Sequence, residues 1–273
     1  MTDELPPAHT RKLRGLTRGG SLIREREIAA EVPVAISVSG FGYAVMMATP
    51  ADLEDFAYGF ALSERLIDAP EQVERVEVRH EPRGVLLDLW LDDSRRALVL
   101  DRVRHRIGES SCGLCGIENL DQALRPLPPV AAPAAIAVEA IFAALTSLSA
   151  HQPLAAATGG VHAAALADAT GRIVAAREDV GRHNALDKLI GHALREGQKL
   201  GTPLDEGFVL LSSRCSYELV EKAALAGVRL LVTVSAPTTL AIERAEAAGL
   251  TLIALARSDE MLVAADPHKV FGE

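Results

Sequence analysis

Three short apolar runs in the second half of the chain constrain its fold more than any other feature. Residues 207–212, 228–235 and 250–256 are almost continuously apolar, and segments with helical spacing, 216–226 and 238–248, separate them. Strands of this kind, joined by helices, are typical of a parallel sheet that is covered on both faces. The pattern therefore predicts an α/β sandwich domain.

An antiparallel hairpin precedes these runs. Residues 161–167 and 172–177 are predicted to be its strands, with the turn at Gly171, and helices are expected over 137–149 and 183–195. A hairpin beside parallel strands makes the sheet mixed.

The first half has the pattern of an α+β unit. Strands are predicted over 32–38, 43–48, 73–80, 84–91 and, more briefly, 97–100. The run Thr49-Pro50-Ala51-Asp52 predicts the start of a helix that extends to residue 66, because a hydroxyl residue followed by proline commonly begins a helix.

Composition changes mark the boundaries between these parts. Residues 1–20 are polar, basic and glycine-bearing, which favours a flexible arm. Prolines at 126, 128, 129 and 133 indicate a linker. The expected organisation is an N-terminal α+β part over 21–133, which contains a Gly- and Cys-rich loop at 108–116, and an α/β domain over 134–273.

Charge and hydropathy exclude several classes of protein. The 273 residues include 28 Lys and Arg against 37 Asp and Glu, a net charge of −9, which argues against sequence-independent nucleic-acid binding. No apolar run reaches the ~20 residues of a membrane span. The N-terminus, Met1-Thr2-Asp3-Glu4, opens acidic with no apolar segment after it, unlike a signal peptide. We therefore expect a cytoplasmic protein with no nucleic-acid or membrane partner.

The loop Ser110-Ser111-Cys112-Gly113-Leu114-Cys115-Gly116 carries the sharpest chemical pattern. Two thiols at this spacing can share a disulfide, a metal ion or a transferred sulfur, and the glycines leave the sulfurs accessible. A zinc site needs four ligands, and neither Cys215 nor any histidine stands at a ligand spacing. Reactive chemistry at Cys112 and Cys115 is thus favoured over a metal site, and over a pair of inert buried thiols.

Polar motifs also occur where the predicted strands of the second half begin or end. These candidate ligand-binding residues are Thr158, Gly159, Gly160, His162, Asp179, Gly181, Arg182, His183, Asn184, Lys188, Ser213, Arg214 and Ser235. Free N–H groups at a helix start, with Arg and His nearby, favour an anion. Taken alone, the Gly159-Gly160 pair fits an ordinary turn, and residues 179–184 fit a helix cap with solvated charges equally well. Strand ends of a parallel sheet line one crevice, which favours a common ligand.

In order along the chain, several motifs together resemble the FdhD family of sulfurtransferases required for formate dehydrogenase activity. They are T-P-A-D-L-E-D-F-A-Y-G-F, S-S-C-G-L-C-G, T-G-G-V-H-A-A-A-L, E-D-V-G-R-H-N-A-L-D-K, S-Y-E-L-V-E-K-A-A-L-A-G and S-A-P-T-T-L-A-I-E. The resemblance covers about Ile28 to Arg257.

The resemblance implies a complete sulfur-transfer role. Such proteins take persulfide sulfur from a cysteine desulfurase and pass it to the bis-molybdopterin guanine dinucleotide (bis-MGD) molybdenum cofactor, which then enters formate dehydrogenase. They are homodimers, they bind GDP or GTP as surrogates of the cofactor ends, and their C-terminal domain is a three-layer α/β/α cytidine deaminase-like fold with a mixed sheet. Cys112 matches the persulfide carrier and Cys115 its partner. Residues matching the cofactor contacts near the last predicted strand are Leu252, Ile253, Ala254, Leu255, Ala256 and Arg257.

The sequence departs from the family pattern at residues 37–40, at Cys215 and at 258–261. The last departure concerns the cofactor contacts near residue 257. His162 is followed by two alanines and no glutamate, which argues against deaminase activity and a deaminase-type metal site. Two other functions remain open: a chaperone that only binds the cofactor, and a thiol–disulfide oxidoreductase that cycles Cys112 and Cys115.

Overall fold

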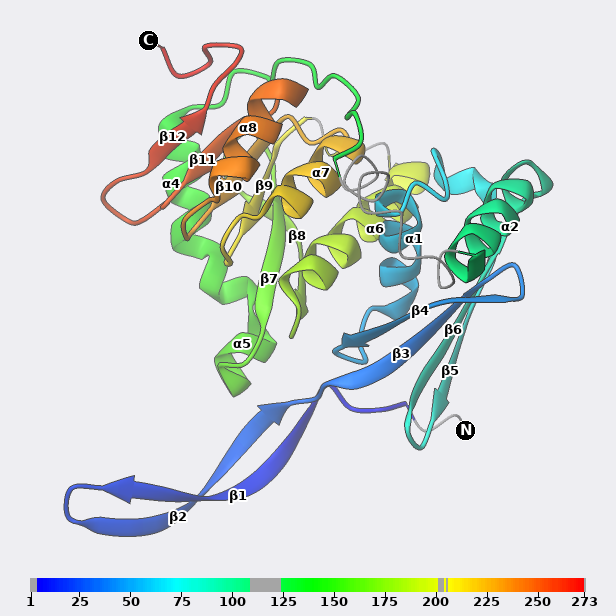
Figure 1. Ribbon diagram of the computed structural model, residues 1–273. Helices are drawn as coiled ribbons and strands as arrows, with labels where there is room; N and C mark the ends of the chain where they lie inside the picture. The colour runs from blue at the N-terminus through cyan, green and yellow to red at the C-terminus, as the bar shows by residue number, and fades with distance from the viewer. Residues whose placement is uncertain (1–3, 109–123, 201–203, 205, 273) are drawn as a thin grey trace.

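The computed structural model describes residues 4–108, 124–200, 204 and 206–272. It contains three sheets, and Figure 1 shows two of them packed around a central pair of helices while the third projects away. None of the described helices is both long enough and apolar enough to cross a membrane.

The largest sheet has six strands in the order β12-β11-β10-β9-β7-β8. Its strands are β7 (His162–Ala167), β8 (Ile173–Asp179), β9 (Phe208–Leu211), β10 (Leu230–Thr233), β11 (Thr251–Ala254) and β12 (Leu262–Ala265). Strands β9, β10 and β11 are parallel, and β7, β8 and β12 add antiparallel pairs. The predicted mixed sheet with a parallel portion is therefore confirmed. Strand β12 was not predicted.

Helices cover both faces of this sheet. The helices are α4 (Val138–Ser147), the short α5 (Pro153–Thr158), α6 (Arg182–Leu200), α7 (Tyr217–Leu225) and α8 (Thr239–Ala248), with a 3-10 turn at Leu148–His151. Alternate β9 side chains enter different cores: Phe208 and Leu210 pack with α4, whereas Val209 and Leu211 pack with α6, α7 and α8. The predicted three layers are confirmed.

The N-terminal part forms a four-stranded sheet in the order β4-β3-β6-β5. Its elements are β3 (Val32–Val38), β4 (Phe41–Ala48), α1 (Leu53–Ser63), a 3-10 turn at Pro70–Gln72, β5 (Val73–Glu81), β6 (Gly84–Leu91) and α2 (Asp93–Gly108). The strand expected near 97–100 is wrong, because these residues lie inside α2. The Asp92 carboxylate accepts the N–H of Arg95 and so caps that helix.

Helices α1 and α6 join the two large sheets. Gly59 and Gly191 allow their backbones to touch: a Cβ at Gly59 would lie 1.7 Å from the Asp187 carbonyl oxygen, and one at Gly191 would lie 1.8 Å from that of Asp55. One apolar core accordingly runs from β3 and β6 through α1 and α6 to β9. The two halves of the chain, predicted as separate parts, share this core.

The N-terminal arm differs from the expectation of a flexible segment over residues 1–20. Strands β1 (Ala8–Thr17) and β2 (Gly20–Ala29) pair antiparallel over their full length and form the third sheet. The expected boundary at residue 20 thus falls at the first residue of β2. Figure 1 shows this hairpin, the β1–β2 arm, extending away from the body of the molecule.

Candidate functional site

The predicted motifs meet at one edge of the six-stranded sheet. His162, at the start of β7, lies opposite Asp179, at the end of β8. Because β7 is antiparallel to β9, this end of β7 lies beside the carboxyl end of β9, where the Ala163 N–H donates to Ser212 Oγ at 2.8 Å. Ser235 follows β10, and its carbonyl oxygen accepts the N–H of Leu255 at 3.2 Å. Tertiary structure therefore brings together residues that are up to 93 positions apart in the chain, from His162 to Leu255.

Cationic groups gather at this edge. His162 is half-buried, and burial lowers the pKa of its imidazole, helped by the nearby charges of Arg182 and Arg214. The Nε of Arg182 is buried and has no hydrogen-bond partner among the described residues. Arg214 is exposed. An anion here would supply an acceptor for the Arg182 guanidinium, so the edge is suited to a phosphate.

The turn over Thr158, Gly159 and Gly160 is the C-terminal end of α5. Gly159 has a φ of 67° and closes the helix, as glycine commonly does. The first N–H groups of α5, those of Leu154 and Ala155, are already bound by the carboxylate of Glu178 at 2.8 Å each. The interpretation of this motif as an ordinary turn is correct for its backbone. Gly160 is exposed at the sheet edge.

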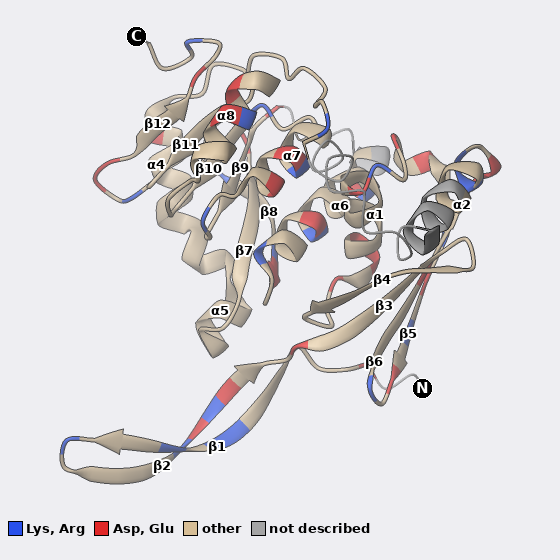
Figure 2. Ribbon diagram, viewed as in Figure 1, with Lys and Arg blue, Asp and Glu red and all other residues tan. Residues whose placement is uncertain are grey.

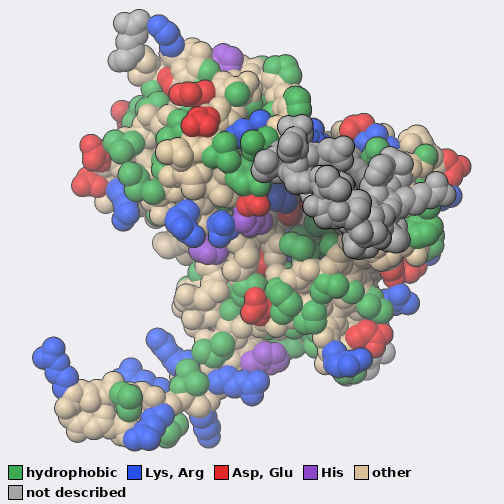
Figure 3. Space-filling model, viewed as in Figure 1, with side chains coloured by type: hydrophobic (Ala, Val, Ile, Leu, Met, Phe, Trp, Pro, Cys, Tyr) green, Lys and Arg blue, Asp and Glu red, His purple; other side chains and the backbone are tan. Residues whose placement is uncertain are grey.

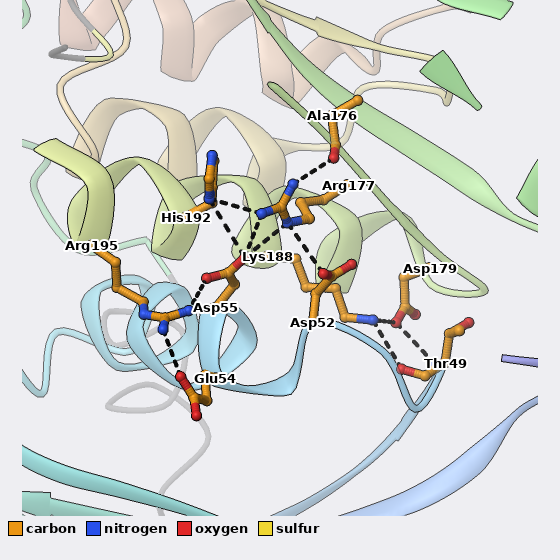
Figure 4. A network of polar contacts seen from close by, with 10 residues as sticks. All are labelled: Thr49, Asp52, Glu54, Asp55, Ala176, Arg177, Asp179, Lys188, His192 and Arg195. Carbon is orange, nitrogen blue, oxygen red and sulfur yellow. Dashed lines mark hydrogen bonds and ion pairs between the residues drawn. The ribbon is translucent and has the colours of Figure 1, made fainter. Parts of the chain in front are cut away.

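Asp179, Asn184 and Lys188 of the E-D-V-G-R-H-N-A-L-D-K motif are buried and bind the other half of the chain, and Figure 4 shows Asp179 and Lys188. Lys188 Nζ lies 2.6 Å from Asp179 Oδ2 and donates to the Thr49 carbonyl at 2.9 Å. Asn184 donates to the Met47 carbonyl and to Asp179. In the structure these side chains fasten the end of β4 to α6, and their predicted contact with a ligand stays a prediction. Of the basic residues in this motif, only Arg182 and His183 reach the surface.

Thr49 also has a role that differs from the predicted helix cap. Its hydroxyl accepts the N–H of Val180 at 3.1 Å, and its own N–H donates to Asp179 at 3.0 Å. Helix α1 begins at Leu53, after Asp52, which has a left-handed φ of 53° and caps nothing with its side chain. Thr49 therefore belongs to the joint between the two halves.

A second network crosses the same joint (Figure 4). The buried carboxylate of Asp55 on α1 binds Arg177 on β8 at 2.8 Å and also Arg195 on α6. Arg177 lies 2.8 Å from His192 Nδ1. Because a buried carboxylate needs such partners, these residues fix the orientation of the two halves.

The residues predicted to contact a cofactor near β11 are mostly core. Leu252, Ile253, Ala254 and Ala256 are no more than 2% exposed. Their side chains are packed in the core, so a ligand contact from these residues would involve their backbone, and that contact stays a prediction. Only Leu255 and Arg257 reach the surface, and Leu255 has a left-handed φ of 50° that turns the chain at the site edge.

A pocket of about 300 Å³ opens beside this edge, between α1, β4, α6 and α7. Its lining includes Tyr43, Ser63, His183, Asp187, Glu218 and Lys222. Lys222 Nζ lies 2.7 Å from Asp187 Oδ2, and Ser63 donates to the same carboxylate. Of these residues only His183 was predicted. The i,i+4 spacing of His183 with Asp187, and of Glu218 with Lys222, was the pattern that could have revealed the pocket.

His183 is a partly exposed titrating group of this pocket. Its Nε2 lies 2.9 Å from Glu218 Oε2 and 3.2 Å from Ser216 Oγ. Burial lowers the pKa of His183, and Glu218 opposes that shift only in part. Because both contacts converge on one ring nitrogen, these residues do not form a Ser-His-acid triad, which needs one partner on each nitrogen.

Cys112 and Cys115 lie outside the described residues, and their roles stay predictions. Cys215 is buried, and burial raises the pKa of its thiol to about 12, as expected of a core residue. Across the parts of the chain that the structure describes, no group of three His, Cys, Asp or Glu side chains could hold a metal ion.

Comparisons with known proteins agree in pointing to one family. The FdhD/NarQ family profile matches residues 29–271. The "Sulfur carrier protein FdhD" of Xanthomonas campestris pv. campestris (strain B100) is 45% identical over 265 residues, which is 97% of this chain and 93% of that protein. The protein of the same name from Cupriavidus necator is 41% identical over 269 residues, 98% and 92% of the two chains.

A solved structure extends the likeness to three dimensions. The crystal structure of a protein from Desulfotalea psychrophila, provisionally assigned as a formate dehydrogenase accessory protein, superposes with a TM-score of 0.75 at 25% identity. The match covers 96% of this chain and 98% of the other. With its motifs, its fold and its close relatives in agreement, this chain belongs to the FdhD/NarQ family.

Proposed function

We propose that this protein carries sulfur on Cys112 and delivers it to the bis-MGD molybdenum cofactor for formate dehydrogenase. The single observation that carries the proposal is the edge formed by His162, Arg182 and Arg214, where the buried Arg182 Nε has no acceptor among the residues that the structure describes. The cofactor is cargo here, and its phosphates are the anions that such an edge suits.

The sulfur-loading step is a thiol exchange. The Cys112 thiolate attacks the outer sulfur of a persulfide on a cysteine desulfurase, a Cys112–sulfur bond forms, and the desulfurase cysteine leaves as a thiolate. No electrons are gained or lost overall. Release of the carried sulfur as sulfide needs two electrons from a thiol, and attack of the Cys115 thiolate on the Cys112 sulfur supplies them while a Cys112–Cys115 disulfide forms.

The first described residues after the cysteine segment lie beside the site. Arg65 donates to the carbonyl of Pro126 at 3.0 Å, and Arg244 binds the carbonyl of Arg125. Arg244 also binds Glu221, which lines the pocket. The chain that follows the cysteines is therefore held beside the pocket, and the pocket adjoins the cationic edge.

The loading step is tested by mass spectrometry after incubation with a cysteine desulfurase and cysteine. We expect a gain of 32 Da per sulfur, as calculated from the mass of one sulfur atom, on the peptide that contains Cys112 and reversible by a thiol reductant. The C112S variant should lose the gain and should fail to activate formate dehydrogenase in a deletion strain. C215S is the matched control and should load normally.

Two results would redirect the proposal. If a folded C112S/C115S variant still activated formate dehydrogenase, the protein would be a cofactor chaperone without carrier chemistry. If the cysteines cycled only between dithiol and disulfide and never gained sulfur, the protein would be a thiol–disulfide oxidoreductase.

A further inference from the structure

The chain that follows the two cysteines enters the described structure at Leu124 and then runs through a proline-rich stretch. Residues 125–130 have the sequence Arg-Pro-Leu-Pro-Pro-Val and belong to no helix or strand, and we call them the proline stalk. Each proline fixes its own φ at about −65° and restricts the residue before it, so the stalk has little conformational freedom. Contacts along the stalk therefore determine the point at which the chain leaves the cysteines.

The far end of the stalk is fixed on the α/β domain. The Val130 N–H donates to the Ala248 carbonyl at 2.7 Å, and the Val130 carbonyl oxygen lies 3.2 Å from His268 Nε2. Val130 is buried, and a Cβ at Gly249 would lie 2.8 Å from its carbonyl oxygen. This close backbone contact gives the stalk a fixed point from which it runs toward the cysteines.

Two arginines hold the near end of the stalk. Arg244 on α8 binds the carbonyl of Arg125, and Arg65, just after α1, donates to the carbonyl of Pro126 at 3.0 Å. A guanidinium forms stronger hydrogen bonds than a neutral donor because it is charged. Arg65 belongs to the N-terminal part and Arg244 to the α/β domain, so both halves of the chain hold the stalk.

Arg244 is itself oriented by a carboxylate. Its Nη2 also binds Glu221 on α7, and the Arg244 side chain is only 14% exposed. The Nε of Arg244 is buried and has no hydrogen-bond partner within the part of the chain that the structure describes. Because a charge removed from water needs a partner of opposite sign, Glu221 keeps this guanidinium in place beside the stalk. Figure 2 shows residues of both charges on α7 and α8.

Helix α7 connects this contact to the pocket and to the cationic edge. Glu221 and Lys222 lie three and four residues after Glu218, so the three side chains share one face of α7, and all of them line the pocket. Glu218 Oε2 lies 2.9 Å from Nε2 of His183, which directly follows Arg182 of the edge. Figure 3 shows cationic and histidine side chains along the rim of the α/β domain that faces the N-terminal part. One helix thus fixes the Arg244 contact relative to the edge.

We propose that Arg244 is a positioning residue for sulfur delivery, which holds the Arg125 carbonyl and so keeps the chain that follows the cysteines at the pocket. This inference rests on the proposed function, because it requires Cys112 to carry the sulfur. The role involves no bond from Arg244 to the sulfur or to the cofactor. Loading needs only that a desulfurase reach Cys112, whereas delivery needs the carried sulfur to reach cargo at the edge. Loss of Arg244 should therefore slow delivery and spare loading.

The test measures the two steps separately on the full-length R244Q protein. Loading is the rate at which the Cys112 peptide gains the mass of sulfur from a cysteine desulfurase and cysteine. Delivery is the rate at which the loaded protein, freed of desulfurase, loses that mass to bis-MGD cofactor extracted from a deletion strain. We expect R244Q to slow delivery about tenfold or more, as for the loss of a hydrogen bond from a charged donor, and to leave loading unchanged.

Two further variants test how Arg244 is held. E221Q removes the charge that orients the guanidinium and should also slow delivery without affecting loading. R244K keeps the positive charge but not the planar fork that serves two acceptors, and should restore delivery only in part. Normal delivery by both R244K and E221Q would overturn the role of the paired contact.

R177Q is the matched control. The Arg177 side chain is 19% exposed and binds one carboxylate, that of Asp55, and one carbonyl, that of Ala176, at 2.8 Å each, but these partners lie outside the stalk. R177Q should lower the urea midpoint and leave the ratio of the delivery rate to the loading rate unchanged. A ratio that falls equally in R177Q and R244Q would overturn the positioning role, because a general loosening would explain both, and so would a normal ratio in R244Q.

The C112S variant separates failure of this inference from failure of the proposed function. If C112S abolishes loading and delivery while R244Q behaves like the unaltered chain, only the positioning role is overturned. If C112S supports formate dehydrogenase activity as well as the unaltered chain does, the proposed function fails, and the role of Arg244 fails with it.

Discussion

Lys188 Nζ lies 2.6 Å from Asp179 Oδ2, and neither side chain is exposed to solvent at all. The carboxylate accepts three further hydrogen bonds, from the backbone N–H groups of Thr49 and Gly181 and from the Asn184 amide. A charge buried in this way is tolerated because every acceptor position has a donor. The pair joins the N-terminal sheet to the domain that carries the site.

The first prediction concerns this pair. K188M leaves the Asp179 charge buried without its cation and should lower the free energy of unfolding by about 3–5 kcal/mol. K12M removes the cation of the exposed Lys12–Glu25 pair and should cost less than about 1 kcal/mol. Urea denaturation measures both. Equal losses of unfolding free energy in the two variants would show that the Lys188–Asp179 pair does not stabilise the contact between the two halves.

The second prediction concerns the contact between α1 and α6. G191A places a methyl group against the Asp55 carbonyl, and we expect a loss of stability of about 1–3 kcal/mol or more, because the backbones must separate. G42A is the control, since a Cβ there meets nothing within 4 Å. Thermal unfolding compares the variants, and a G191A protein as stable as G42A would show that the helices are not in backbone contact.

The third prediction concerns pH. Burial lowers the pKa of His183, so the unfolded chain binds a proton more readily than the folded chain. The stability that neutral His183 contributes is complete above the unfolded pKa of about 6.5 and is lost as the pH falls through the folded pKa. The stability advantage of the unaltered chain over H183Q should therefore shrink from pH 7.5 to pH 5.5. A difference in urea midpoint between the two proteins that stayed constant from pH 7.5 to pH 5.5 would contradict the lowered pKa of His183.

The fourth prediction concerns the cationic edge. R182Q removes the guanidinium whose Nε has no partner in the described part of the chain. If the edge binds a guanine nucleotide as proposed, the Kd should rise roughly 10- to 100-fold, which corresponds to about 1.5–3 kcal/mol for a charge-assisted hydrogen bond. R172Q is the matched control, because Arg172 is 78% exposed in the β7–β8 turn at the other end of these strands. Calorimetry distinguishes the two, and similar losses would indicate non-specific attraction.

The fifth prediction concerns Cys215. Burial raises the pKa of its thiol to about 12, so almost no thiolate is present near neutral pH. Iodoacetamide should label Cys215 only after denaturation, as peptide mass spectrometry would show. Rapid labelling of the native protein at Cys215 would require this part of the core to open, and would make the residue a second candidate for sulfur chemistry.

The local sequence pattern predicted helices and strands well where an apolar run or a helical spacing extended over many residues. The apolar runs at 207–212, 228–235 and 250–256 contain β9, β10 and β11, and their parallel pairing follows from the helices between them. The apolar triplet Leu98-Val99-Leu100 led to the wrong prediction of a strand, because three apolar residues fit a strand and a helix equally. The cap at Asp92 was the feature that distinguishes the two.

The sequence by itself determined the family, the order of strands and helices, and the strand-end placement of the polar motifs, because these depend on neighbours in the chain. Tertiary structure decided which motif residues face solvent. Asp179, Asn184 and Lys188 are buried because residues 47–49, more than 125 positions away, pack against them, while Arg182 stays at the surface. Burial is a property of long-range packing, so no local pattern separates a buried ion pair from a ligand-binding cation.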